Sequence, residues 1–174
     1  MSNTTVSELI EALNQKTPYL LAGSGATPPM RLACQVAPPV PWDKNAIESS
    51  LDLRLPAKLI QLWNDASELR LMEDVTYGQW GCILWSPNQA LAKHREATGF
   101  LSRRDFRPGD FIVGEFRGDP ELVIVRCDPS AADYGSVVIT MAMDPRYDWP
   151  TVAPSIVDFI SQFIADPNRK YWEA

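Results

Sequence analysis

The sequence predicts an α+β domain in which a largely antiparallel central sheet is flanked by helices. Three observations support this fold class. Apolar residues recur at helical spacing near both ends of the chain. The middle of the chain instead holds short apolar runs that are typical of strands. Compact turn signals separate several of these runs, and helices that precede and follow hairpin-linked strands are typical of the α+β class.

The start of the chain predicts a helix followed by an irregular segment. Thr5 and Glu8 have the spacing of a capping box, and apolar residues then follow at helical intervals, which predicts a helix over about 5–15. Six of the fifteen prolines fall in the next segment, 17–42. Because proline removes a backbone donor and breaks helices, this segment is expected to be extended and mostly irregular.

We interpret residues 1–40 as an N-terminal helical and proline-rich extension, and residues 41–174 as the main domain. In the main domain, Asp43 and Ser86 precede apolar stripes at positions suited to helix caps. One predicted helix covers 44–51 and a second begins at Pro56. A third, some 8–16 residues long, follows Ser86, and the last covers the apolar stripe 152–164, which Asp166-Pro167-Asn168 ends.

The predicted strands of the main domain are apolar on both faces, so we expect them to be central and covered. Gly118-Asp119-Pro120 is a turn signal between two of them. The predicted strands cover 68–72, 79–85, 110–117, 121–127 and 136–143.

Composition limits the function classes. The formal net charge of −6 and the pI near 4.8 disfavour nucleic acid or an anionic membrane as a direct partner, because phosphate binding depends on clustered Lys and Arg. The acidity predicts a basic protein partner or serves solubility alone, and both interpretations stay open. No apolar run is long enough to span a bilayer, and the first residues do not resemble a signal peptide. Three widely spaced cysteines predict reduced thiols in a cytoplasmic protein.

Residues that could carry catalysis are few. His94 is the only histidine, and its neighbours Lys93 and Arg95 predict that it lies exposed on the polar face of a helix. The cysteines and His94 lack zinc-ligand spacing, so we expect no metal and no cofactor. Gly23-Ser24-Gly25 lacks the context of a phosphate-binding loop. Among the carboxylates near the 118–120 turn, Glu121 is expected at a strand start where its charge is hydrated.

Two segments combine aromatic and acidic residues in the way that protein interfaces do. They are 74–80 and 144–150. The alternative for Trp149 is that it packs on the last helix as a hydrophobic staple. The candidate partner-binding residues are Glu73, Asp74, Tyr77, Trp80, Asp119, Asp144, Tyr147, Asp148 and Trp149, the aromatic ones as anchors and the acidic ones as complementary charge.

Four stretches together resemble the SUKH superfamily, the Smi/Knr-type domain. They are "IESSLDLRLPAKLIQLW", "GCILWSPNQAL", "FIVGEFRGDPELVIVRCDP" and "VAPSIVDFISQFI", in the family's order, over roughly 42–164. The chain has "WNDASEL" where the family usually has Asn-Gly. The positions that match the family's motifs are Leu55, Pro56, Trp80, Gly81, Gly114, Gly118, Asp119 and Phe159.

The resemblance implies a SUKH-like fold and a domain that binds proteins without catalysing a reaction. Bacterial members of the superfamily are immunity proteins that cover a toxin, often a nuclease or a deaminase. Fungal relatives are regulatory scaffolds. We therefore expect an immunity protein that neutralises a toxin, with a basic toxin domain as the expected protein partner. The alternative is a scaffold whose proline-rich 17–42 segment docks an endogenous protein.

Overall fold

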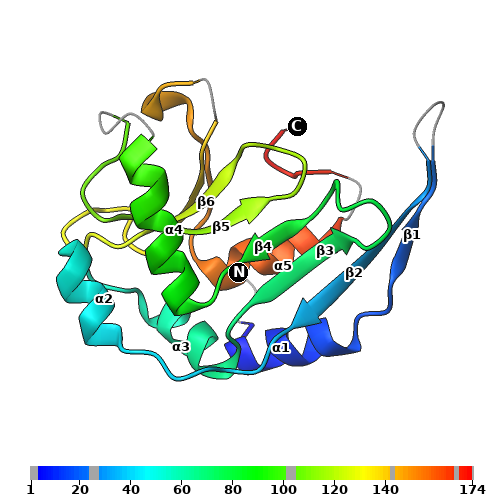
Figure 1. Ribbon diagram of the computed structural model, residues 1–174, viewed down its shortest axis with the longest axis horizontal. Coiled ribbons are helices and arrows are strands. Elements are labelled where there is room, and N and C mark those ends of the chain that lie inside the picture. Colours follow the sequence, from blue (N-terminus) through cyan, green and yellow to red (C-terminus); the bar gives the residue numbers. More distant parts are fainter. Residues whose placement is uncertain (1–3, 24–27, 101–104, 142–143, 167–168, 174) are drawn as a thin grey trace.

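The computed structural model describes residues 4–23, 28–100, 105–141, 144–166 and 169–173. Its centre is an eight-stranded antiparallel sheet in which every strand pairs with its neighbours in the chain. Figure 1 shows this meander running from the N-terminal hairpin to the last strand. The strands are β1 (Tyr19–Leu21), β2 (Met30–Val36), β3 (Leu69–Asp74), β4 (Cys82–Leu84), β5 (Asp110–Phe116), β6 (Leu122–Arg126), β7 (Val137–Ile139) and β8 (Thr151–Ala153).

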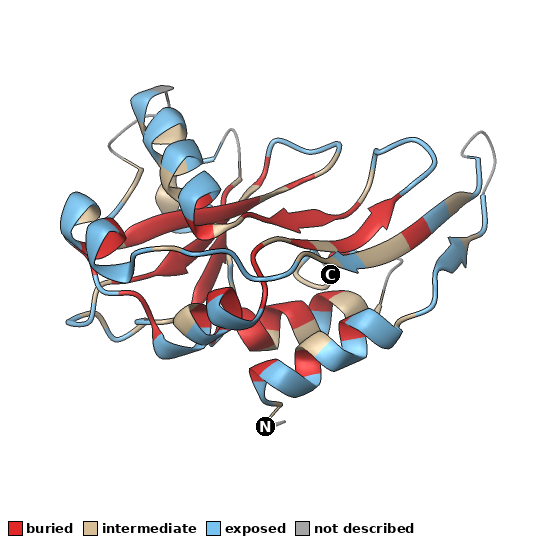
Figure 2. Cartoon of the chain, turned by 60° about the horizontal axis from the view of Figure 1, so that its bottom comes forward, coloured by how far each residue is buried: buried red, intermediate tan, exposed pale blue. Residues whose placement is uncertain are grey.

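Helices cover the two faces of the sheet unequally. Three of them, α1, α3 and α5, contact one another on one side of the sheet, whereas α4 contacts β5 and lies on the other side (Figures 1 and 2). The helices are α1 (Val6–Gln15), α2 (Lys44–Leu51), α3 (Ala57–Asp65), α4 (Pro87–Phe100) and α5 (Ile156–Ala165), with a short 3₁₀ turn, η1 (Arg146–Asp148).

Aromatic packing of α5 against the sheet forms much of the core. Phe159 and Phe163 stack on each other, and Phe163 meets Phe116 of β5 edge to face. Trp172, near the C-terminus, packs on the same three rings. Phe159 is fully buried, and burial of one such side chain stabilises the fold by about 1.5–3 kcal/mol. The α+β class that the sequence predicts is the class of the structure.

Capping signals located the helices well. The capping box of Thr5 and Glu8 is present, and the Asp43 side chain accepts a hydrogen bond from the Ala46 amide at the start of α2. The prediction is wrong at the last helix, where residues 151–153 form β8 and α5 begins only at Ile156. Ser155 caps that helix by accepting from the Asp158 amide. The apolar pattern extended too far because Val152 of the short edge strand β8 continues the apolar spacing of the helix that follows.

The proline-rich segment is more regular than predicted. Residues 19–21 and 30–36 form two strands of the main sheet, so the segment is extended as predicted, but these parts of it are regular rather than irregular. The prolines flank these strands rather than lie inside them, and they therefore remove no ladder hydrogen bond. Leu13 of α1 and Leu32 of β2 are buried in the common core. A separate N-terminal extension is thus not confirmed.

The remaining strand predictions are correct in place and differ in length. The predicted strand over 136–143 is observed only as β7, and positions 142–143 lie outside the described residues. Within the part of the chain that the structure describes, none of the helices has the length and apolar character needed to cross a membrane.

Candidate protein-binding surface

The turn between β3 and β4 presents Tyr77 on a rigid backbone. The Asp74 carboxylate accepts hydrogen bonds from the backbone amides of Thr76, Tyr77 and Gln79, at 2.9–3.3 Å. These bonds satisfy donors that a tight turn would otherwise leave open. The Tyr77 side chain is 54% exposed. The Tyr77 side chain is therefore exposed to solvent on a turn whose backbone conformation is fixed by hydrogen bonds.

The acids of this turn are used inside the protein. Asp74 is 2% exposed and Glu73 is 8% exposed, so neither lies in open water. Glu73 forms ion pairs with Arg70 at 3.1 Å and with Arg117 at 3.4 Å. The sequence suggested both carboxylates as complementary charge for a partner. The structure instead shows one organising a turn and the other neutralised by two guanidinium groups.

A lysine from the C-terminal segment ties down the turn between β5 and β6. Lys170 bonds Asp119 at 2.8 Å and also bonds Glu121, which is 7% exposed. Burial raises the pKa of the Glu121 carboxyl, and the Lys170 ammonium only partly opposes that effect. The prediction of a hydrated Glu121 is therefore wrong, because its partner lies far along the chain.

The two turns lie against each other. A Cβ atom at Gly118 would come within 2.5 Å of the Gln79 carbonyl oxygen, and the Arg117 amide donates to the Gly81 carbonyl at 2.8 Å. The first five candidates along the chain, from Glu73 to Asp119, are thus gathered at one end of the sheet. Trp80 is half-buried, and its Nε1 atom is buried without a partner among the described residues.

The loop between β7 and β8 carries the other four candidates. Tyr147 is 81% exposed, and Asp144 and Asp148 are exposed beside it. Trp149 donates from Nε1 to the Asp144 carbonyl at 2.9 Å, and its ring packs on Phe106 with centroids 5.6 Å apart. Trp149 therefore braces its own loop, whereas Ser155 caps α5.

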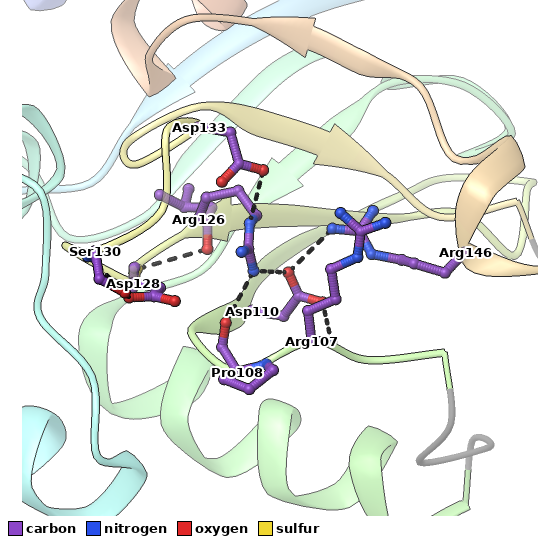
Figure 3. A network of polar contacts seen from close by, with 10 residues as sticks. Arg107, Pro108, Asp110, Arg126, Asp128, Ser130, Asp133 and Arg146 are labelled. Atoms are coloured by element: carbon purple, nitrogen blue, oxygen red, sulfur yellow. Dashed lines mark hydrogen bonds and ion pairs between the residues drawn. The ribbon is translucent and has the colours of Figure 1, made fainter.

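A buried charge network fixes this loop to the sheet (Figure 3). The Asp110 carboxylate accepts from Arg126 at 2.6 Å and from Arg146 of the loop at 3.2 Å. Arg126 also pairs with Asp133 at 3.0 Å. Asp110 and Arg126 are 5% and 3% exposed. The sequence analysis missed this network, in which Asp110 lies 16 residues before Arg126 and 36 residues before Arg146. Charged residues at the ends of two apolar strands were the available signal.

The candidates around the 74–80 turn and those on the 144–149 loop are not linked to each other by hydrogen bonds among the described residues. Among the described residues, no hydrogen bond or ion pair joins the loop of Tyr147 to the turn of Tyr77. The nine predicted residues thus fall into two groups, and the exposed members of each group form a surface. One lies around the turn at 74–80, and the other lies on the loop at 144–149.

His94 is not the exposed side chain that its neighbours predicted. Its Nδ1 atom accepts a hydrogen bond from the Ile112 amide at 3.2 Å, and its ring packs on Phe111. Burial lowers the pKa of His94 from its ordinary value of 6.5 to about 4, although Asp110 opposes the change. The imidazole is therefore neutral at pH 7 and holds α4 to the backbone of β5.

The polar cluster at the start of α5 has a structural explanation. A cavity of about 400 Å³ is bordered by Lys58, Ser155 and Asp158. The Ser155 hydroxyl bonds the Asp158 carboxylate and accepts from the Lys58 ammonium at 3.2 Å. Lys58 is engaged with Ser155 and Asp158, and Ser155 is already the cap of α5.

Neither metal nor thiol chemistry is indicated for the described residues. They contain no group of three His, Cys, Asp or Glu side chains that could hold a metal ion. All three cysteines are free, and burial raises the pKa of the Cys82 and Cys127 thiols, which disfavours the reactive thiolate.

Comparison of the chain with protein-family models and with curated proteins finds no match.

Proposed function

We propose that the chain is a non-catalytic protein-binding domain that acts as an immunity protein, binding and neutralising a cognate toxin of the nuclease or deaminase class. The observation that carries the proposal is Tyr147, which is 81% exposed on a loop braced by Asp110 and Phe106. Tyrosine is frequent among the residues that dominate binding energy. A loop already fixed in the free protein loses little freedom on binding.

The charge on this surface suits a basic partner. Asp144 and Asp148 flank Tyr147 and are exposed, so their charges are available to another molecule. A nuclease or deaminase that holds nucleic acid needs a cationic surface, and an acidic inhibitor associates with such a surface quickly. Tyr77, on the first turn, would be a second anchor. Asp119 would contribute less charge because it is shared with Lys170.

The toxin class and the cytoplasmic location rest on the SUKH resemblance together with the free thiols. Three unpaired cysteines suit a reducing compartment, where an immunity protein would meet a toxin that has entered the cell. The scaffold alternative needed the proline-rich segment as a free docking peptide. Two strands of the sheet occupy 19–21 and 30–36, so that observation no longer favours it.

Co-expression tests the proposal. The chain should restore growth of cells that express the C-terminal toxin domain of a large secreted protein encoded beside it. Tyr147→Ala should weaken binding of the purified toxin domain by about thirtyfold or more, because loss of a hot-spot tyrosine costs about 2 kcal/mol. Tyr19→Ala is the matched control, since Tyr19 is 41% exposed on β1, outside both surfaces.

Two results would count against the proposal. Cells that die despite co-expression would contradict toxin neutralisation. Equal loss of affinity in Tyr19→Ala and Tyr147→Ala would show that the loop is not the binding surface.

A further inference from the structure

A second cavity lies beside the charge network, between the C-terminal half of α4 and the segment 106–110. Its volume is about 370 Å³, within the range of pockets that hold small organic molecules. Two arginines, Arg95 and Arg107, line it together with His94 and Phe106. None of the nine candidate partner-binding residues lines this cavity, although Phe106 also packs on Trp149 of the 144–149 loop.

The two arginines offer open hydrogen-bond donors. Neither the Arg95 nor the Arg107 guanidinium has a hydrogen bond or ion pair with another described residue. Their neighbours in sequence and space do have partners, as the pairing of Lys93 with Glu96 at 3.6 Å shows. Guanidinium groups present planar, paired donors that match the oxygens of carboxylates and phosphates.

The one carboxylate that lines the described part of this cavity is already occupied. Asp110 Oδ1 accepts from Arg126 and Arg146, and Asp110 Oδ2 accepts from the Arg107 amide at 2.7 Å. Arg107 and Arg126 repel Arg146, whereas Asp110 and Asp133 attract it. Figure 3 shows Arg107 and Arg146 extending toward each other beside Asp110.

The charges around the cavity therefore do not balance. Two guanidinium groups, those of Arg95 and Arg107, and one carboxylate, that of Asp110, line the cavity, and Asp110 is already paired with Arg126 and Arg146. This local positive excess stands in a chain whose net charge is −6. The last turn of α4 borders the cavity with helix carbonyls, which disfavour an anion, but a helix end carries only about half an elementary charge.

His94 adds a neutral donor. Because Nδ1 accepts the Ile112 amide, the proton of the neutral ring is on Nε2. That N–H has no hydrogen-bond partner among the described residues. The cavity thus combines two cationic donors, one neutral donor and an aromatic ring. Both oxygens of its carboxylate, Asp110, already accept hydrogen bonds from other groups.

We propose that this cavity binds an oxyanion carried on an organic group, either a carboxylate or a phosphate ester. Arg95 and Arg107 hold the anionic head, His94 donates to it, and Phe106 packs on the organic body. The proposal does not rest on toxin neutralisation, because neither exposed tyrosine takes part in the site, although Phe106 also contacts Trp149 of the 144–149 loop.

NMR titration of the purified chain tests the site, with phenyl phosphate and benzoate as separate probes and sodium chloride as the ionic-strength control. At least one probe should shift the Arg95 and Arg107 Nε–H signals and the His94 ring signals to saturation. Arg107→Gln should weaken that probe by about tenfold or more, the usual effect of losing a charged hydrogen bond. Arg31→Gln is the matched control, because Arg31 is an exposed arginine on β2.

The outcomes separate clearly. Saturation by phenyl phosphate alone identifies a phosphate site, and saturation by benzoate alone identifies a carboxylate site. If neither probe shifts these signals to saturation beyond the effect of sodium chloride at the same ionic strength, the proposal is overturned. Equal weakening by Arg31→Gln and Arg107→Gln also overturns it, because the effect would then be one of overall charge. A thermal melt of each variant confirms that the fold is intact.

Discussion

The two tyrosine-bearing segments reach the same result by different physical means. The turn at 74–80 is fixed locally, since Asp74 bonds amides two to five residues along the chain. The loop at 144–149 is fixed at long range, since Arg146 pairs with Asp110, which lies 36 residues earlier. A local brace depends on one side chain and its own turn. A long-range brace depends on buried charges that must remain paired, and it is therefore coupled to the stability of the whole sheet.

Removal of the charge at the centre of the long-range brace should have the largest effect. Asp110→Asn leaves Arg126 and Arg146 buried without their shared carboxylate. Loss of one partner of a buried ion pair typically lowers the free energy of unfolding by about 3–5 kcal/mol. Urea denaturation measures this difference.

The matched control for that variant is Asp133→Asn. The Asp133 side chain is 36% exposed and makes one ion pair, with Arg126. Its loss should cost about 1 kcal/mol or less, in the range of solvent-exposed pairs. Equal effects of Asp110→Asn and Asp133→Asn would mean that the loop does not depend on the buried network.

Acid should lower the stability of the fold through protonation of His94, which joins α4 to β5. Burial lowers the pKa of His94 to about 4 in the folded state, against 6.5 ordinarily, so the unfolded chain binds a proton more readily. Its contribution to stability is complete above pH 6.5 and is lost as the pH falls toward 4. The shift corresponds to about 3 kcal/mol at most.

Measurement of unfolding free energy between pH 4 and pH 7 checks this prediction. His94→Gln can still accept the Ile112 amide but has no titrating group, so its pH dependence over that interval should be shallower. Identical pH dependence in the variant and the natural chain would rule out His94 as the group responsible.

Loss of the local brace should have the smallest and most confined effect. Asp74→Ala removes the acceptor for three backbone amides, and loss of such charge-assisted bonds should lower stability by about 2 kcal/mol. Hydrogen exchange of the Thr76 and Gln79 amides should accelerate, while that of Arg146 should not change. Asp144→Ala, at an exposed aspartate, is the control. Accelerated exchange at both tyrosine-bearing segments would show that they are coupled rather than independently fixed.

Comparison of the two segments also explains which site features could be predicted. The aromatic and acidic character of both segments was visible in the sequence, and both contain an exposed tyrosine. The availability of the acids was not visible. Asp74 is buried with the amides of its own turn as partners, whereas Glu121 is buried beside a partner that the sequence pattern does not mark. For Glu121 that partner is Lys170, which lies 49 residues away.

His94 is the clearest case of the same limit. Its flanking charges indicate the polar face of a helix, and that inference treats the helix as if it stood alone in water. In the folded chain, α4 lies against β5, and a β5 amide needs an acceptor at that position. The side chain that was predicted to be exposed therefore joins two elements and borders a cavity.

The sequence by itself determined the elements whose cause is local. Capping boxes, turn residues and apolar periodicity act between residues a few positions apart, and they specified α1, α2, the strands of the main domain and the α+β class. Only the tertiary structure decided that β1 and β2 join the sheet, which acids are neutralised, and that the Arg95 and Arg107 guanidinium groups border one cavity. Those outcomes depend on which distant side chains meet in a low-dielectric interior, and contacts of that kind leave no periodic signal in the chain.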